Sequence, residues 1–151
     1  MPDLSAADDW EFRAAPRVVR LHAIVWSVVL PGAALLGWFA LPLPIRVLFT
    51  APQVATLIFF LAFLVGAVWV VSSGWVRAGR RGLAFRNGLR THRIGWDEVR
   101  GIRFRPGDPW AFVLLDSPLE SLPLMGIMRT DGERAERHVE ELRRIVATYA
   151  P

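Results

Sequence analysis

Two long stretches of this chain are free of charged residues, and they limit the folds open to it. Residues 21–45 contain no Arg, Lys, Asp or Glu, and residues 47–76 again contain none, with Arg46 alone between them. A helix rises about 1.5 Å per residue, so about 20 apolar residues cross the roughly 30 Å hydrocarbon core of a bilayer. Both stretches exceed that length. We therefore predict two membrane-spanning helices joined by a tight turn.

The second stretch is the stronger candidate for a membrane span. Its centre, residues 57–71, has no polar face, which an amphipathic surface helix would show. The first stretch is interrupted by Pro31, Gly32 and Gly37, which helices in lipid tolerate. Together with Ala33, these glycines would also allow spans to pack closely and the chain to associate with itself.

Two other interpretations of the apolar stretches are open but less favoured. A signal peptide has a short apolar core and a cleavage site of small residues, whereas the first stretch is long and is followed by another. A buried hairpin of a soluble protein would need more chain to cover it than the 75 residues that remain. The hydrophobic share of 53% excludes disorder for most of the chain, and the lack of cysteine excludes a disulfide scaffold and a cysteine zinc site.

The basic residues near the span ends predict the orientation. Arg46 alone lies in the turn, whereas each outer flank has three arginines: Arg13, Arg17 and Arg20 before the first span, and Arg77, Arg80 and Arg81 after the second. Basic residues concentrate on the cytoplasmic side of a membrane. We therefore predict a multi-pass protein of the plasma membrane with both termini cytoplasmic. Residues 1–20 form an N-terminal segment, residues 21–76 the hairpin and residues 77–151 a cytoplasmic domain.

After Arg81 the sequence pattern changes to that of a small sheet. Alternating residues 82–86 and 89–94 predict two strands, and Asn87-Gly88 between them predicts a hairpin with a type I′ turn. A turn carrying Trp96 follows. Further strands are predicted at residues 100–105, 110–115 and, as a short last strand, 120–124.

The end of the chain is predicted to be an amphipathic helix. Thr130 or Asp131 is a candidate cap for its start. Apolar residues recur at spacings of three and four and define one buried face: Ala135, Val139, Leu142, Val146 and Tyr149. A sheet this small needs a helix to cover its open face, so the C-terminal part is predicted to be one α+β domain.

The order of these features resembles that of a known family. A two-span hairpin is followed by Asn87-Gly88-Leu89-Arg90-Thr91, by a Trp-Asp-Glu-Val turn with a Gly-Ile-Arg-Phe strand, by Trp110 and by a terminal helix. The chain resembles bacterial pleckstrin-homology (PH-like) membrane proteins of the actinobacterial low-molecular-weight-antigen type. The resemblance implies a small antiparallel β-sandwich or split barrel capped by a C-terminal helix, and no catalytic residue. It also implies a structural core motif: Trp96, Val99, Ile102, Phe104 and Trp110.

The residue types that carry catalysis or bind metals lack the required spacing. His22, His92 and His138 lie far apart in the sequence, with no histidine pair at ligand spacing. Asp97 and Glu98 are neighbours that point apart, so a turn is favoured over an acid–base pair. No phosphate-binding or nucleophile motif is present. We therefore predict no enzyme, no metal and no cofactor.

Arginines give the sharpest functional signal. Residues 77–105 hold nine arginines and two acids. Six of them flank the second span or the first hairpin: Arg77, Arg80, Arg81, Arg86, Arg90 and Arg93. Each would be attracted to anionic lipid headgroups by about 1 kcal/mol near the surface, although they could equally set topology and solvate a strand face. Nucleic acid is not expected, because glutamates of the terminal helix would repel phosphates.

The sequence favours a non-catalytic, membrane-anchored interaction module that binds a protein partner at the cytoplasmic face. An exposed sheet edge is a template for strand addition, and Trp110 and Phe112 could extend a binding surface if they face outward. Two alternatives stay open. A lipid-binding module would bind anionic vesicles in a salt-sensitive way, and a subunit of a larger membrane complex would depend on its two spans for assembly.

Overall fold

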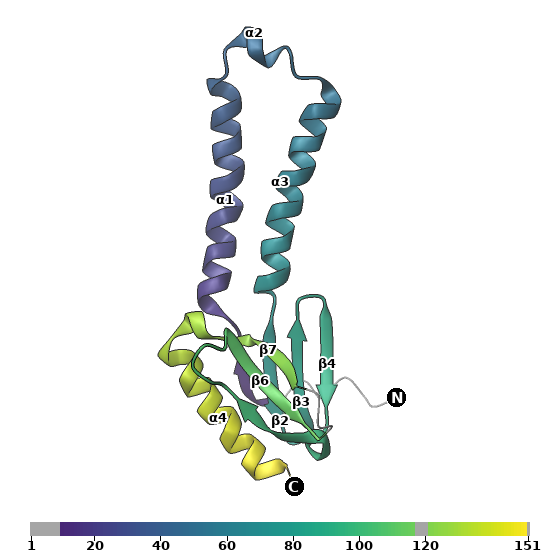
Figure 1. The fold of residues 1–151 in the computed structure, drawn as a ribbon, viewed down its shortest axis with the longest axis vertical. Coiled ribbons are helices and arrows are strands. Elements are labelled where there is room, and N and C mark those ends of the chain that lie inside the picture. The colour runs from purple at the N-terminus through teal and green to yellow at the C-terminus, as the bar shows by residue number, and fades with distance from the viewer. Residues whose placement is uncertain (1–9, 117–120, 151) are drawn as a thin grey trace. The chain divides into compact units, whose positions relative to one another are not determined.

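The computed structural model describes residues 10–116 and 121–150, which divide into two units (Figure 1). The hairpin unit comprises residues 19–72, and the sheet unit comprises the described residues before and after it. The first part of the predicted N-terminal segment and the beginning of the strand predicted at 120–124 lie outside the described residues.

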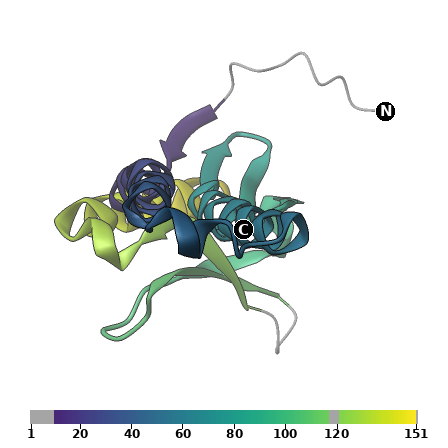
Figure 2. The same cartoon turned by 90° about the horizontal axis from the view of Figure 1, so that it is seen from above.

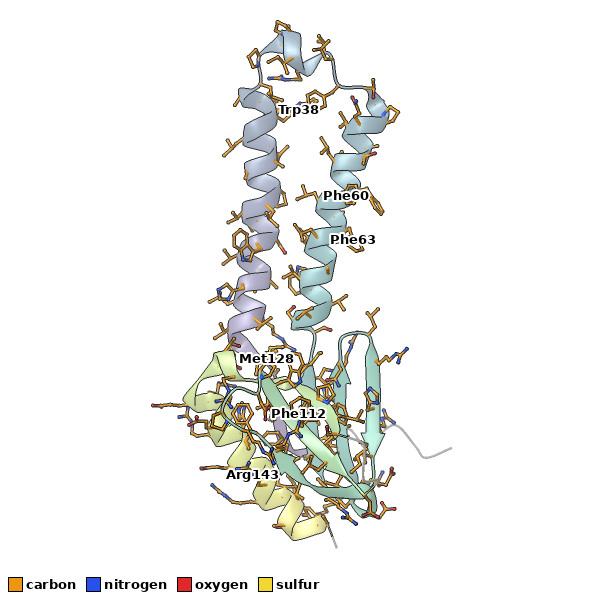
Figure 3. All side chains as sticks on the ribbon, viewed as in Figure 1. Trp38, Phe60, Phe63, Phe112, Met128 and Arg143 are labelled. Carbon is orange, nitrogen blue, oxygen red and sulfur yellow. The ribbon has the colours of Figure 1, made fainter. Side chains whose placement is uncertain are left out.

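The hairpin unit contains two long helices, α1 (Arg17–Ala40) and α3 (Ala51–Ser72), which Figure 2 shows end-on. Both are long and apolar enough to cross a membrane, and most of their side chains are exposed, including those of Phe60 and Phe63, which Figure 3 labels. Polar contacts join them, and in one the Nε–H of Arg20 donates to the Ser72 carbonyl at 3.2 Å. The Nε1–H of Trp69 donates to Ser27 Oγ at 2.7 Å, and this hydroxyl in turn donates to the Ala23 carbonyl.

The turn between the helices is organised by its single charged residue. The Arg46 guanidinium, at the end of the short helix α2 (Leu43–Arg46), donates to the carbonyls of Phe39 and Leu41 at 2.9 Å each. It also lies over the Trp38 ring, which contacts Phe49 edge-on. A cation at the C-terminal end of a helix offsets the helix dipole and binds its last carbonyls. Arg46 therefore has a local structural role.

The sheet unit contains two antiparallel sheets and a helix, which confirms the predicted fold class. The first sheet has the order β1-β2-β3-β4 and the second β5-β6-β7. Helix α4 (Glu133–Tyr149) packs against both. The strands are β1 (Trp10–Ala14), β2 (Trp75–Gly79), β3 (Gly82–Asn87), β4 (Arg90–Ile94), β5 (Val99–Arg103), β6 (Trp110–Leu115) and β7 (Ser121–Met128). Two short 3-10 helices, η1 (Trp96–Glu98) and η2 (Arg129–Asp131), complete the unit.

The first two strands were not predicted. Strand β1 lies within the segment that the sequence assigned to residues 1–20, yet it pairs with β2 and buries Phe12 and Ala14 in the core. Strand β2 occupies the end of the second apolar stretch, because α3 stops at Ser72 and the chain becomes extended at Trp75. Trp75, which falls within the hairpin predicted over residues 21–76, therefore lies on a strand.

The predicted hairpin at Asn87-Gly88 is present with a different turn. Asn87 pairs with Arg90 at the end of the ladder, so Gly88 and Leu89 form the two-residue loop. Gly88 has a φ of 58°, and no described residue other than glycine has a positive φ. A single positive φ at the first loop position is the type II′ pattern, so the type I′ prediction was wrong.

The C-terminal helix buries the predicted face. Ala135, Val139, Leu142 and Val146 are all buried in the core. The predicted cap was wrong: Gly132 precedes the helix, without any side-chain hydrogen bond from Thr130 or Asp131. The positive φ of 57° at Gly132 turns the chain into the helix, which frees the Asp131 carboxylate for another partner.

One histidine of α4 makes the stability of the sheet unit depend on pH. The half-buried His138 ring lies edge-on to Phe12 of β1, with 5.7 Å between ring centroids. Burial is the main cause that lowers the pKa of His138 below its ordinary value of 6.5; Arg134 adds to it, while Glu141 and Asp131 oppose it. A lowered pKa means that protonation favours the unfolded chain.

We therefore expect His138 to leave the free energy of unfolding unchanged above pH 6.5. As the pH drops from 6.5 through the lowered pKa of the folded state, the free energy of unfolding should fall. Unfolding of the full chain in mild detergent at pH 5 and pH 7.5 measures this. His138→Gln should show a smaller loss between the two pH values. An unchanged loss in that variant would contradict the assignment.

Candidate functional site

The outer face of the first sheet carries a row of arginines. Phe12, Val76, Phe85 and their alternate neighbours point into the core, so the intervening residues face outward. The strand register places Arg13, Arg77 and Arg93 in one row across the sheet, with the small, buried Ala84 between Arg77 and Arg93. The row therefore brings three arginines together on one face of the sheet.

A second row lies next to the first and contains an aromatic ring. The register aligns Trp75, Arg86 and Thr91. The Arg77 guanidinium lies 4.7 Å from the centroid of the Trp75 ring, and Arg86 Nε donates to the Gly88 carbonyl at 2.8 Å. Neither contact neutralises the charge of the arginine. We call Arg13, Trp75, Arg77, Arg86 and Arg93 the arginine face.

The other three predicted arginines lie elsewhere. Arg80 and Arg81 are exposed in the turn between β2 and β3, and Arg90 begins β4 beside the hairpin tip. The arginine cluster of the sequence is therefore split in three by the fold. The structure also adds Arg13, which the sequence analysis used only to predict orientation, and Trp75, which fell within the predicted hairpin. The alternation of Phe12 and Ala14 with Arg13 was a signal that could have indicated a strand.

The β2–β3 turn is linked to the end of α4. Arg80 lies 3.7 Å from Glu11, and the Tyr149 hydroxyl donates to the same carboxylate at 2.7 Å. This hydrogen bond is the main cause that raises the pKa of Tyr149 above its ordinary value of 10.0. The Tyr149 ring stacks on Trp96. Strand β1 is thus fixed to the helix, which keeps Arg13 in the arginine face.

Asp131 caps the first long helix instead of α4. Its carboxylate oxygens accept hydrogen bonds from the backbone N–H groups of Arg17 at 3.2 Å and Val18 at 3.0 Å, the first two residues of α1. Free N–H groups at a helix start favour an acidic acceptor. Asp131 therefore fixes the beginning of α1 to the segment between β7 and α4.

Asp131→Ala is expected to lower the free energy of unfolding by about 1–2 kcal/mol, because it removes this cap. Asp131→Asn keeps a hydrogen-bond acceptor, so a smaller loss is expected. Urea unfolding of the full chain in mild detergent measures both, with Thr130→Ala as the matched neighbour. Equal losses for Asp131→Ala and Thr130→Ala would show that the cap contributes nothing.

The second sheet presents a less charged outer face. Trp110 and Phe112 alternate with the buried Ala111 and Val113 along β6, so both point outward, and both are partly exposed. The register places Phe112 between Arg103 and Pro123, and the Arg103 guanidinium lies 4.4 Å from the Phe112 ring centroid. Arg103 is also paired with Asp108 at 3.8 Å. This face is therefore largely apolar, and its cation, Arg103, already contacts the Phe112 ring and the Asp108 carboxylate.

The remaining predicted residues have structural positions. Trp96, Val99 and Ile102 are buried in the core, and Phe104 packs against it. His22, His92 and His138 lie on α1, β4 and α4. Within residues 10–116 and 121–150 no three His, Asp or Glu side chains gather as metal ligands would. Asp97 and Glu98 are exposed in η1.

Comparison with known proteins now adds to this geometry. Residues 75–145 match the family model described as "Bacterial PH domain". Uncharacterised proteins of Mycobacterium tuberculosis (strain ATCC 25618 / H37Rv) and Mycobacterium bovis are 32% identical to the chain over 149 residues, which is 97% of this chain and 96% of each relative. The chain belongs to the bacterial PH-domain family. No solved structure matches the chain significantly.

The matched residues include β2 to β7 and most of the covering helix, and the PH domain of this chain is completed by β1 from before the helices. The family membership predicted from the Trp96 turn and the strand after it is thus confirmed. A PH-like domain is the fold of an interaction module, which directs attention to its surfaces. The arginine face is the surface where β1 contributes a charged residue.

Proposed function

We propose that this protein is a non-catalytic, membrane-anchored PH-domain module that binds an acidic protein partner through the arginine face at the cytoplasmic side of the plasma membrane. The observation that carries the proposal is the register that brings Arg13, Arg77 and Arg93 into one row beside Trp75 and Arg86. Arginine and tryptophan are the residues most enriched in binding hot spots.

Membrane anchoring rests on the two long helices. Their apolar side chains are exposed along their whole length, far beyond the apolar patches that a soluble surface carries. The arginines on both outer flanks, against the internally bonded Arg46, support cytoplasmic termini. Cysteine placed at Leu48 in the turn should react with an impermeant maleimide on intact cells, whereas cysteine at Glu98 should react only after lysis. The opposite result would reject this orientation.

Electrostatics favours an acidic partner for the face. Neighbouring guanidinium groups present a positive surface, which is complementary to the carboxylates of an acidic partner. Arginine pairs with carboxylates through two parallel hydrogen bonds, which gives the contact a defined geometry. A protein is favoured over lipid because Trp75 supplies a large aromatic contact within the same surface.

A photo-crosslinking amino acid at Thr91, which lies on this face, tests the proposal in living cells. We expect a discrete cross-linked protein product, and Arg77→Glu and Arg93→Glu, each made alone, should weaken it by about 30-fold or more. Arg144→Glu, an exposed arginine of α4, is the matched charge control and should leave the product unchanged.

Three outcomes would reject the protein-binding proposal. Cross-links to lipid alone would favour the anionic-lipid module instead. Absence of any cross-linked product would show that the arginine face is not an interface. A product that also disappears in Arg144→Glu would show that overall charge, and not this face, is responsible.

A further inference from the structure

The tip of the β3–β4 hairpin carries the most exposed hydrophobic side chain of the PH domain. Leu89 is 75% exposed, and the other strongly exposed large hydrophobic residues of the described chain all lie between Leu21 and Val71, in the hairpin unit. A two-residue loop needs no leucine for its conformation, because Gly88 provides the positive φ. Leu89 is thus a solvent-exposed apolar group on a tight turn.

The tip is hydrogen-bonded to the residue that follows α3 and to β7. Ser73, the residue directly after the last residue of α3, donates from its Oγ to the Gly88 carbonyl at 3.1 Å, and Arg86 donates to the same carbonyl. On the other side, the Asn87 amide donates to the Pro123 carbonyl at 2.6 Å and accepts from the Met125 N–H. The loop is therefore fixed to the exit of the helix and to β7.

The position of the C-terminal end of α3 relative to the membrane follows from the length of the helix. Helix α3 has 22 residues and is about 33 Å long, close to the roughly 30 Å of the hydrocarbon core. If α3 spans the bilayer, as proposed above, Ser72 lies at the border of the hydrocarbon and Ser73 in the interfacial layer. The hydrogen bond from Ser73 places Gly88 at the same depth, and Leu89 next to it.

The flanking charges fit the same surroundings. Arg86 precedes the tip and the exposed Arg90 follows it. Long arginine side chains place their stems against apolar surface and their guanidinium groups at the lipid phosphates. An exposed leucine between two arginines thus matches the layer in which acyl chains meet phosphates.

We infer that the tip of the β3–β4 hairpin inserts into the interfacial layer of the membrane that holds α3, with Leu89 against the acyl chains and Arg86 and Arg90 at anionic phosphates. The inference rests on the proposed membrane anchoring and adds a second, non-covalent attachment of the domain. Arg93 lies three residues from Arg90 along β4, about 10 Å from it, so insertion leaves Arg13, Arg77 and Arg93 for a partner and assigns Arg86, the arginine of that face nearest the tip, to the membrane.

The chain contains no cysteine, so single cysteine variants allow a direct test. The full chain with Leu89→Cys is labelled with an environment-sensitive fluorophore and reconstituted into vesicles of phosphatidylcholine and phosphatidylglycerol. We expect blue-shifted emission, quenching by lipids with a nitroxide near the headgroup, and iodide quenching several-fold weaker than for the label at Glu98→Cys. Glu98 is the matched control, exposed in η1 beyond the other end of β4.

Phe60→Cys in the middle of α3 separates the two possible failures. If its label is not quenched by lipids with a deep nitroxide, the proposed membrane span is wrong. If the Phe60 label is quenched but the Leu89 label is as accessible to iodide as the Glu98 label, the span stands and the insertion of the tip is rejected. Vesicles of phosphatidylcholine alone should show weaker insertion, because they lack the anionic partner of Arg86 and Arg90.

Discussion

Trp96→Ala is expected to lower the free energy of unfolding of the PH domain by about 3–5 kcal/mol, the usual cost of truncating a buried large aromatic residue. Trp96 is 7% exposed, and its Nε1–H donates to the Gly79 carbonyl at 2.9 Å. Its ring stacks on Tyr149 at 6.1 Å between centroids. One side chain therefore connects η1, the end of β2 and the last turn of α4.

The same substitution at two tryptophans separates the hydrogen bond from the ring. Trp96→Phe keeps an aromatic ring but leaves the buried Gly79 carbonyl without its donor, so a loss of about 1–3 kcal/mol is expected. The Trp110 Nε1 atom is buried and has no hydrogen-bond partner among the described residues. Trp110→Phe removes that unsatisfied donor, so its cost should be well below that of Trp96→Phe.

Pulse proteolysis of the full chain in mild detergent across a urea series measures all three variants without relying on tryptophan fluorescence. Trp110→Phe as damaging as Trp96→Phe would mean that lost ring area, and not the bond to Gly79, determines the cost. If Trp96→Ala unfolded at the same urea concentration as the wild type, Trp96 would not contribute to the core.

Local sequence patterns predicted the parts of the fold that depend on neighbouring residues. The apolar stripe of α4 was readable because its spacing repeats within one helix, and Asn87-Gly88 marked a hairpin whose strands adjoin it. The two long helices followed from length and lack of charge alone. In each case the contacts that fix the element lie a few residues apart, so the pattern and the structure share one cause.

The parts that were missed depend on distant pairings. Strand β1 pairs with β2 across more than 60 residues of chain, and no pattern near Trp10–Ala14 indicates which strand it pairs with. The arginine face was therefore incomplete in the sequence, because Arg13 reaches it only through this pairing. Asp131 is a residue type that often caps helices. It does cap a helix, but the helix is α1 and not α4, which follows it in the chain.

The close approach of β7 to β2 is another such distant contact, and it leads to the second large expected effect. A Cβ added at Gly126 would lie 2.6 Å from both the Trp75 carbonyl carbon and the Val76 nitrogen. These are backbone atoms of a strand that is paired on both sides, so they cannot move aside as a side chain could. Glycine is required here because two backbones approach each other closely.

Gly126→Ala is therefore expected to lower the free energy of unfolding by about 3 kcal/mol, at the upper end for overpacked sites. Gly101→Ala is the matched control, because Gly101 also lies in a strand and a Cβ there would meet no atom within 4 Å. Its replacement should be neutral or stabilise by up to about 1 kcal/mol, since it reduces the freedom of the unfolded chain. The same proteolysis assay measures both variants, and equal midpoints would show that β7 and β2 lie further apart than described.

Because Asn87 bonds to β7 beside this contact, Gly126→Ala should also loosen the hairpin tip and increase iodide access to a label at Leu89.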